Sequence, residues 1–146
     1  MIIPKPSPGL VIRYSYLWHS EFLAGRDEGI KDRPSAIIAT MRIGDDGETR
    51  VLVLPVTHSA PLSGVAVLEI PRTIKRTLGL DAERSWIVLA EWNEFAWPGP
   101  DLRPVPGDEG GKIAYGSLSP GFFNRVRDEF IAVVEAGRAK RVKRTE

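Results

Sequence analysis

The fold is decided by Lys31-Asp32-Arg33-Pro34-Ser35-Ala36-Ile37-Ile38-Ala39, taken together with Val51-Leu52-Val53-Leu54-Pro55-Val56-Thr57-His58-Ser59. Each stretch contains an aliphatic run of strand length with polar residues at one end. Arg33 leads into the first strand, and Thr57, His58 and Ser59 follow at the end of the second. If the two strands pair as a hairpin, these polar side chains emerge at the same edge of one sheet. A guanidinium beside hydroxyls and an imidazole is suited to holding a phosphodiester.

The sequence between the two strands favours the hairpin. Gly44-Asp45-Asp46-Gly47 is strong turn chemistry, because Asp and Gly tolerate positive φ. A tight turn at Asp45 and Asp46 pairs residues whose numbers sum to roughly 91. Arg33 is then predicted to lie across from Thr57 and His58, and a bulge would change this by only a residue or two.

Length and composition set broad limits. With 146 residues and ordinary apolar and charged fractions, we expect one globular domain, spanning residues 1–137. Residues 138–146 carry five basic side chains, and we expect a disordered basic tail that leaves 15 basic and 18 acidic residues elsewhere. The absence of cysteine excludes disulfides and thiolate sites. No apolar run reaches membrane-spanning length and the start does not read as a signal peptide, so we expect a cytoplasmic protein.

The remaining elements predict a mainly β protein with helices. Residues 9–17, 65–70 and 86–92 read as further strands, and residues 71–79 as a short helix between proline and glycine. Ser119 and Pro120 open an amphipathic helix that Gly137 ends. Because the strands are apolar on both faces, we expect a small, strongly curved antiparallel sheet, closed as a barrel with the last helix packed on it. A dimer interface would cover the remaining apolar surface.

The order of these features resembles the PemK/MazF family, the endoribonuclease toxins of toxin–antitoxin modules. The resemblance covers roughly residues 9–95 and rests on five short segments: Gly9-Leu10-Val11-Ile12, Arg33-Pro34, Val53 to Ser59, Leu68-Glu69-Ile70 and Ser85 to Glu91. It implies an SH3-like barrel, a homodimer, a cognate antitoxin and growth inhibition. It further implies cleavage of single-stranded RNA without a metal or other cofactor, with Arg33 and Thr57 at the catalytic positions. The chain departs from the family pattern at Trp92-Asn93-Glu94-Phe95, where a polar pair is common.

The residue types fit this chemistry. Attack of a ribose 2′-hydroxyl on the adjacent phosphate needs one proton removed, one supplied and a phosphorane stabilised. Arg33 suits the last role, and Thr57 can fix a phosphate oxygen but is a poor base. His58 and Glu91 are the candidate acid–base groups, with Ser59 and Trp92 as possible RNA contacts. Strand alternation places Ser59 on the same face as Thr57 and turns His58 away, which ranks His58 lower.

Simpler interpretations stay open. Arg33 can form a surface ion pair with Asp32 or Glu28, and Thr57 and Ser59 can be ordinary strand-end residues. His58 can be an exposed histidine without function. With only His19 and His58 as histidines, no spacing predicts a metal site. The alternative function is a catalytically silent barrel that binds a protein or RNA in the same groove.

Overall fold

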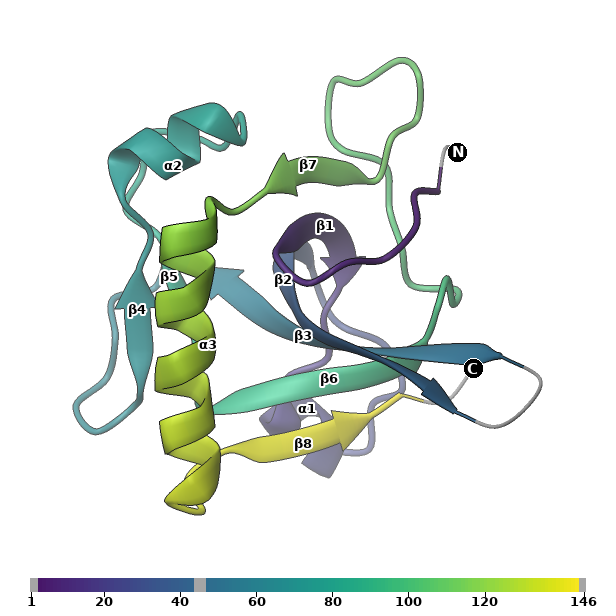
Figure 1. Ribbon diagram of the computed structural model, residues 1–146. Coiled ribbons are helices and arrows are strands. Elements are labelled where there is room, and N and C mark those ends of the chain that lie inside the picture. The colour runs from purple at the N-terminus through teal and green to yellow at the C-terminus, as the bar shows by residue number, and fades with distance from the viewer. Residues whose placement is uncertain (1–2, 44–46, 145–146) are drawn as a thin grey trace.

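The computed structural model describes residues 3–43 and 47–144 as one coiled sheet flanked by three helices (Figure 1). The helices are α1 (His19–Leu23), α2 (Arg72–Thr77) and α3 (Pro120–Glu135). The strands are β1 (Leu10–Ser15), β2 (Asp32–Ile43), β3 (Glu48–Thr57), β4 (Val67–Glu69), β5 (Trp86–Val88), β6 (Glu91–Ala96), β7 (Ala114–Ser117) and β8 (Lys140–Lys143).

The hairpin of β2 and β3 has the predicted register. Ser35 pairs with Pro55 and Ile37 with Val53, and beyond a bulge Ala39 pairs with Leu52. These numbers sum to 90 and then 91, because the bulge adds one residue to β2. The predicted turn residues Gly44, Asp45 and Asp46 lie outside the described residues. The register brings the start of β2 beside the end of β3, which is the arrangement the site requires.

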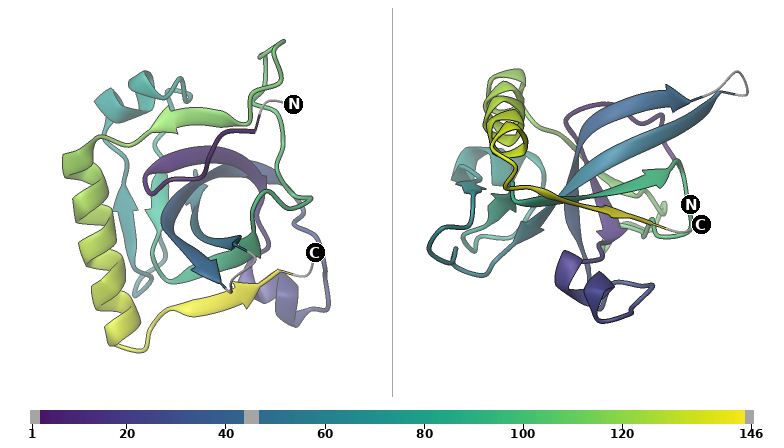
Figure 2. Two further views of the ribbon diagram at one scale, coloured as in Figure 1. Left: turned by 45° about the vertical axis from the view of Figure 1, so that its right-hand side comes forward. Right: turned by 90° about the horizontal axis from the view of Figure 1, so that it is seen from below.

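The sheet is mainly antiparallel and runs in the order β4-β5-β3-β2-β1-β7. The strand β3 also pairs with β6 through a different part of its length, and β6 pairs in parallel with β8. The strands coil strongly about one another, as Figure 2 shows. Among the described residues the strands do not close into a ring, so the closed barrel is not confirmed. The coarser prediction, a mainly β protein with helices, is confirmed.

Both faces of the sheet are covered by apolar side chains, as the two-sided strands predicted. Alternation along β2 and β3 sends Leu54 and Val56 to one face and Val51 and Val53 to the other. The first face packs against α3 through its buried Phe122, Val126 and Phe130. The second face surrounds Tyr14, Tyr16 and Phe95. Within the described residues, no helix has the length and apolar character needed to cross a membrane.

The disorder predicted for residues 138–146 is wrong for the part that the structure describes. Residues 140–143 form β8 beside β6, and Val142 is fully buried. Arg144 follows with a buried guanidinium that donates to the carbonyl of Ser15 at 2.7 Å and pairs with Asp101 at 3.1 Å. Glu146 lies outside the described residues. The body of the protein therefore extends past the predicted boundary at residue 137.

Candidate functional site

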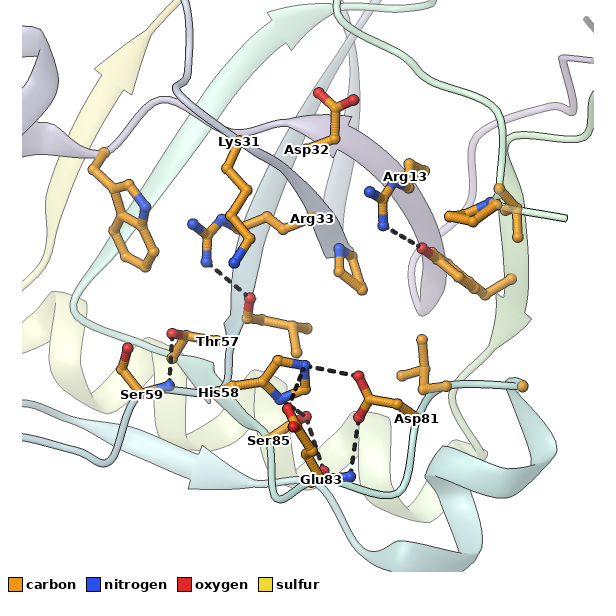
Figure 3. A pocket seen from close by; sticks show the side chains of 18 residues that line it. Arg13, Lys31, Asp32, Arg33, Thr57, His58, Ser59, Asp81, Glu83 and Ser85 are labelled. Atoms are coloured by element: carbon orange, nitrogen blue, oxygen red, sulfur yellow. Dashed lines mark hydrogen bonds and ion pairs between the residues drawn. The ribbon is translucent and has the colours of Figure 1, made fainter.

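A pocket of about 680 Å³ lies where β2 begins and β3 ends (Figure 3). Four of the six residues that the sequence singled out line it: Arg33, Thr57, His58 and Ser59. They gather here because the antiparallel register places the entry of one strand beside the exit of its neighbour. The predicted grouping of these side chains at one edge of the sheet is confirmed.

Arg33 is half-buried, with its guanidinium directed into this pocket. The group lies 4.9 Å from the centroid of the Trp18 ring and donates through Nη1 to the carbonyl of Val56 at 3.4 Å. Its buried Nε has no hydrogen-bond partner. Burial lowers the pKa of Arg33, although the nearby Glu21 and Tyr16 oppose that shift. The cation is thus held by an aromatic ring and a carbonyl, with donors left for a ligand.

The simpler role of Arg33 as a surface ion pair is not what the structure shows. The neighbouring Asp32 pairs instead with Arg103, with 3.7 Å between the charged groups. Among the described residues, no carboxylate forms an ion pair with Arg33, Glu28 included. A half-buried guanidinium without an anionic partner can accept an anionic ligand from solution.

Thr57 and Ser59 form a short turn at the end of β3. The Thr57 hydroxyl accepts a hydrogen bond from the Ser59 backbone N–H at 3.1 Å. This bond fixes the Thr57 side chain while leaving its own hydroxyl proton to donate. A hydroxyl in this place can orient a phosphate oxygen.

His58 shares the pocket, contrary to the prediction from strand alternation. The alternation rule ends with β3 at Thr57, so it does not govern the next residue. The His58 Nε2 lies 2.9 Å from Asp81 and 3.8 Å from Glu83, and Nδ1 lies 3.0 Å from the carbonyl of Arg84. The imidazole therefore has the orienting partners that the sequence did not reveal.

A buried lysine organises the loop that carries these carboxylates. Lys75 of α2 is 4% exposed and donates to Asp81 at 2.9 Å, to Ser85 Oγ at 2.7 Å and to the carbonyl of Glu83. Partial burial works to raise the pKa of Asp81. The hydrogen bond from Lys75 and the charges of His58 and Lys75 outweigh it and leave that pKa below its ordinary value. Asp81 is thus a stable carboxylate that is held by Lys75 and faces His58.

Glu91 and Trp92 do not line the pocket, so the predicted roles for them find no support in the structure. Glu91 accepts hydrogen bonds from the His19 backbone at 2.8 Å and the Tyr16 hydroxyl at 3.1 Å. Trp92 packs edge-on against Phe130 of α3, with 5.5 Å between the ring centroids. Both side chains of β6 serve the packing of the sheet instead.

The two walls of the pocket differ in charge. One wall carries three basic residues and one acidic residue from β1 and around the start of β2: Arg13, Lys31, Arg33 and Asp32. The other wall carries Asp81 and Glu83 from the loop between α2 and β5. Sequence reasoning missed the acidic wall, because its residues carry no periodic pattern and lie more than twenty positions from Thr57. It also predicted no metal site, yet His58, Asp81 and Glu83 come together with ligand atoms within 4.8 Å of one another.

Comparison of the chain with protein-family models, with curated proteins and with solved structures finds no match. The resemblance to the PemK/MazF family therefore stays a proposal.

Proposed function

We propose that the protein is an endoribonuclease of the PemK/MazF type that cleaves single-stranded RNA without a metal, on a scaffold related to the SH3-like barrel. One observation carries the proposal. The half-buried guanidinium of Arg33 faces an open pocket beside Thr57 and has no carboxylate partner among the described residues. The coiled sheet with a helix packed on it supports the scaffold assignment.

In the proposed reaction, a ribose 2′-oxygen attacks the adjacent phosphorus and the bond to the 5′-oxygen breaks. The products are a 2′,3′-cyclic phosphate and a new 5′-hydroxyl. Arg33 stabilises the additional negative charge on the non-bridging oxygens, and Thr57 donates to one of them. A pre-positioned donor of this kind contributes about 3–4 kcal/mol to the transition state, since the protein needs no reorganisation as charge develops.

The proton of the 2′-hydroxyl requires an acceptor. His58 does not suit this role as it stands, because both of its ring nitrogens already face acceptor oxygens. Glu83 is the better group, since its carboxylate lines the pocket with a side chain 74% exposed and makes only a long contact of 3.8 Å to His58. We assign proton removal to Glu83 within this proposal, and water in the open pocket supplies the proton to the leaving 5′-oxygen.

The partners follow from the same assignment. An antitoxin would inhibit by placing an acidic segment across the pocket, where its carboxylates compete with RNA phosphates for Arg33. A homodimer and growth inhibition on expression belong to the proposal as properties that the family resemblance implies.

The test is cleavage of a mixed-sequence single-stranded RNA in EDTA, with analysis of the new ends. Wild-type protein should yield 2′,3′-cyclic phosphate ends, and Arg33→Ala should lower the rate by about 10²–10³-fold or more. Arg125→Ala is the matched control, since this arginine lies on α3 and pairs with Glu129 at 3.0 Å, away from the pocket. Equal rates for wild type and Arg33→Ala would exclude the proposed role of Arg33.

The engagement of both His58 nitrogens favours a second candidate, a silent module that binds RNA or protein through the same pocket. In that case wild-type protein would bind the RNA without cleaving it, and Arg33→Ala would weaken binding. The same RNA and the same variants therefore separate the two functions.

A further inference from the structure

Three side chains of the kinds that bind metals meet on the acidic wall of the pocket. We propose that His58, Asp81 and Glu83 form a binding site for a divalent transition-metal ion of the zinc class. Their ligand atoms lie within 4.8 Å of one another, and all three residues are exposed to the pocket. The site goes beyond the proposed cleavage step, which needs no metal, although it shares Glu83 with that step.

The orientation of the imidazole is the first argument. The Nδ1 of His58 lies 3.0 Å from the Arg84 carbonyl and 3.0 Å from the Ser85 hydroxyl. A proton on Nδ1 suits both contacts, because the carbonyl only accepts hydrogen bonds and the hydroxyl can also accept. In the neutral ring Nε2 then presents its lone pair to the Asp81 carboxylate 2.9 Å away. Two lone pairs at that distance repel unless a cation lies between them. A histidine whose Nδ1–H binds a backbone carbonyl while Nε2 faces carboxylates has the orientation typical of a metal ligand.

The support behind the ligands is the second argument. Lys75 holds Asp81 through Oδ1 at 2.9 Å, which leaves Oδ2 directed at His58. The same ammonium binds the carbonyl of Glu83 and the hydroxyl of Ser85, so it fixes the backbone of the loop that carries both carboxylates. Metal ligands are commonly oriented by hydrogen bonds from neighbouring groups that do not themselves touch the metal. The arrangement differs in this respect from a chance cluster of surface acids.

The spacing and chemistry of the ligand atoms select the metal. Bonds of about 2.0–2.2 Å to a tetrahedral ion place neighbouring ligand atoms about 3.4 Å apart. The two distances from His58 Nε2, 2.9 and 3.8 Å, lie on either side of that value. An imidazole with two carboxylates suits zinc or cobalt better than magnesium or calcium, which prefer oxygen ligands alone. Three protein ligands leave a fourth position open toward the pocket.

The experiment is a calorimetric titration of EDTA-treated, dialysed full-length protein at neutral pH with Zn²⁺ and, separately, with Mg²⁺. We expect one Zn²⁺ per chain and much weaker binding of Mg²⁺. His58→Ala and Glu83→Gln should each weaken Zn²⁺ binding at least about tenfold. Co²⁺ should give the intense visible absorption of a tetrahedral site in wild type and lose it in His58→Ala.

His19→Ala is the matched control, since it removes the other histidine of the chain, and it should leave Zn²⁺ binding unchanged. Circular dichroism and urea denaturation should show that the exposed variants remain folded. Zn²⁺ binding of equal strength in wild type, His58→Ala and Glu83→Gln would overturn the proposal. So would the absence of Zn²⁺ binding to wild type, which would leave a proton as the cation between His58 and Asp81. Because no RNA is present, either outcome leaves the ribonuclease proposal untouched, and cleavage in EDTA tests that proposal without the metal.

Discussion

Replacement of Arg144 by alanine tests whether the C-terminal segment is part of the folded body. The side chain is 2% exposed, and its guanidinium pairs with the Asp101 carboxylate at 3.1 Å, where that side chain is itself 10% exposed. It also donates to the Ser15 carbonyl at 2.7 Å and the Tyr14 hydroxyl at 3.0 Å. Removing one partner of a buried ion pair costs about 3–5 kcal/mol, because the remaining charge keeps its desolvation penalty. We therefore expect Arg144→Ala to lose that much free energy of unfolding.

The assay is urea denaturation followed by tryptophan fluorescence. With a slope of about 1.5 kcal/mol per molar urea, the expected loss moves the midpoint down by about 2–3 M. Arg141→Ala is the control in the same C-terminal segment, since its side chain is 57% exposed and lies 3.8 Å from Glu94. An exposed pair of this kind contributes about 0–1 kcal/mol. Equal midpoints for the two variants would refute the docking of β8 and the network behind it.

Three further predictions concern the sheet, the helix and the loop that leads into β2. Burial raises the pKa of Glu91 above its ordinary 4.5, so the folded state holds this proton more tightly than the unfolded chain. The free energy of unfolding of the wild type should then fall relative to that of Glu91→Gln as pH rises from the pKa of Glu91 in the unfolded chain through its raised pKa in the folded protein. A difference in urea midpoints that does not change with pH would contradict this. Val126→Ala should lose about 2 kcal/mol of unfolding free energy because Val126 is fully buried, whereas Val134→Ala, at a position 40% exposed, should change little in the same thermal or urea scan. A methyl group on Gly29 would collide with a backbone carbonyl, so Gly29→Ala should lower stability by about 1–3 kcal/mol and displace the loop before Arg33, while Gly121→Ala, with open space around it, should do neither. Equal stabilities of these two glycine variants would show that the loop adapts without strain.

The parts of the fold that follow from local pattern were predictable. The β2–β3 register follows from two aliphatic runs and a turn of Gly and Asp between them, and these determine which residues face each other. The last helix begins after Ser119 and ends before Gly137, as its capping residues and apolar spacing predict. Since Arg33 and Thr57 are placed by that one hairpin, their grouping was predictable as well.

The C-terminal strand was not predictable, because its stability comes from distant partners. Five basic side chains within nine residues are typical of a solvated tail, and Val142 is the single aliphatic residue among them longer than alanine. The burial of Arg144 depends on its contacts with Tyr14, Ser15 and Asp101, which precede it by 43 to 130 positions. No local rule connects residues across such separations, so tertiary contacts override the compositional signal.

The acidic wall was missed for a related reason. Asp81 and Glu83 lie in a loop without periodicity, and their meeting with His58 depends on the pairing of β5 with the end of β3. The buried Lys75 is also invisible in the sequence, where a basic residue in the last turn of a short helix is expected to face solvent. Only the packing of α2 shows that this lysine points inward and holds the loop.

The opposite charges of the two walls connect the two proposals. A phosphodiester near Arg33 is attracted by that wall and repelled by Asp81 and Glu83, each by about 1–4 kcal/mol at 4 Å, depending on the local dielectric. A divalent ion on the acidic wall turns the repulsion by Asp81 and Glu83 into an attraction, and it offers an open coordination position to a phosphate oxygen. It also occupies the carboxylate of Glu83 that would take the proton in cleavage. The ion should therefore strengthen RNA binding while slowing cleavage. Because coupling between two ligands is reciprocal, bound RNA should raise the affinity for the metal ion by the same factor by which the ion raises the affinity for RNA.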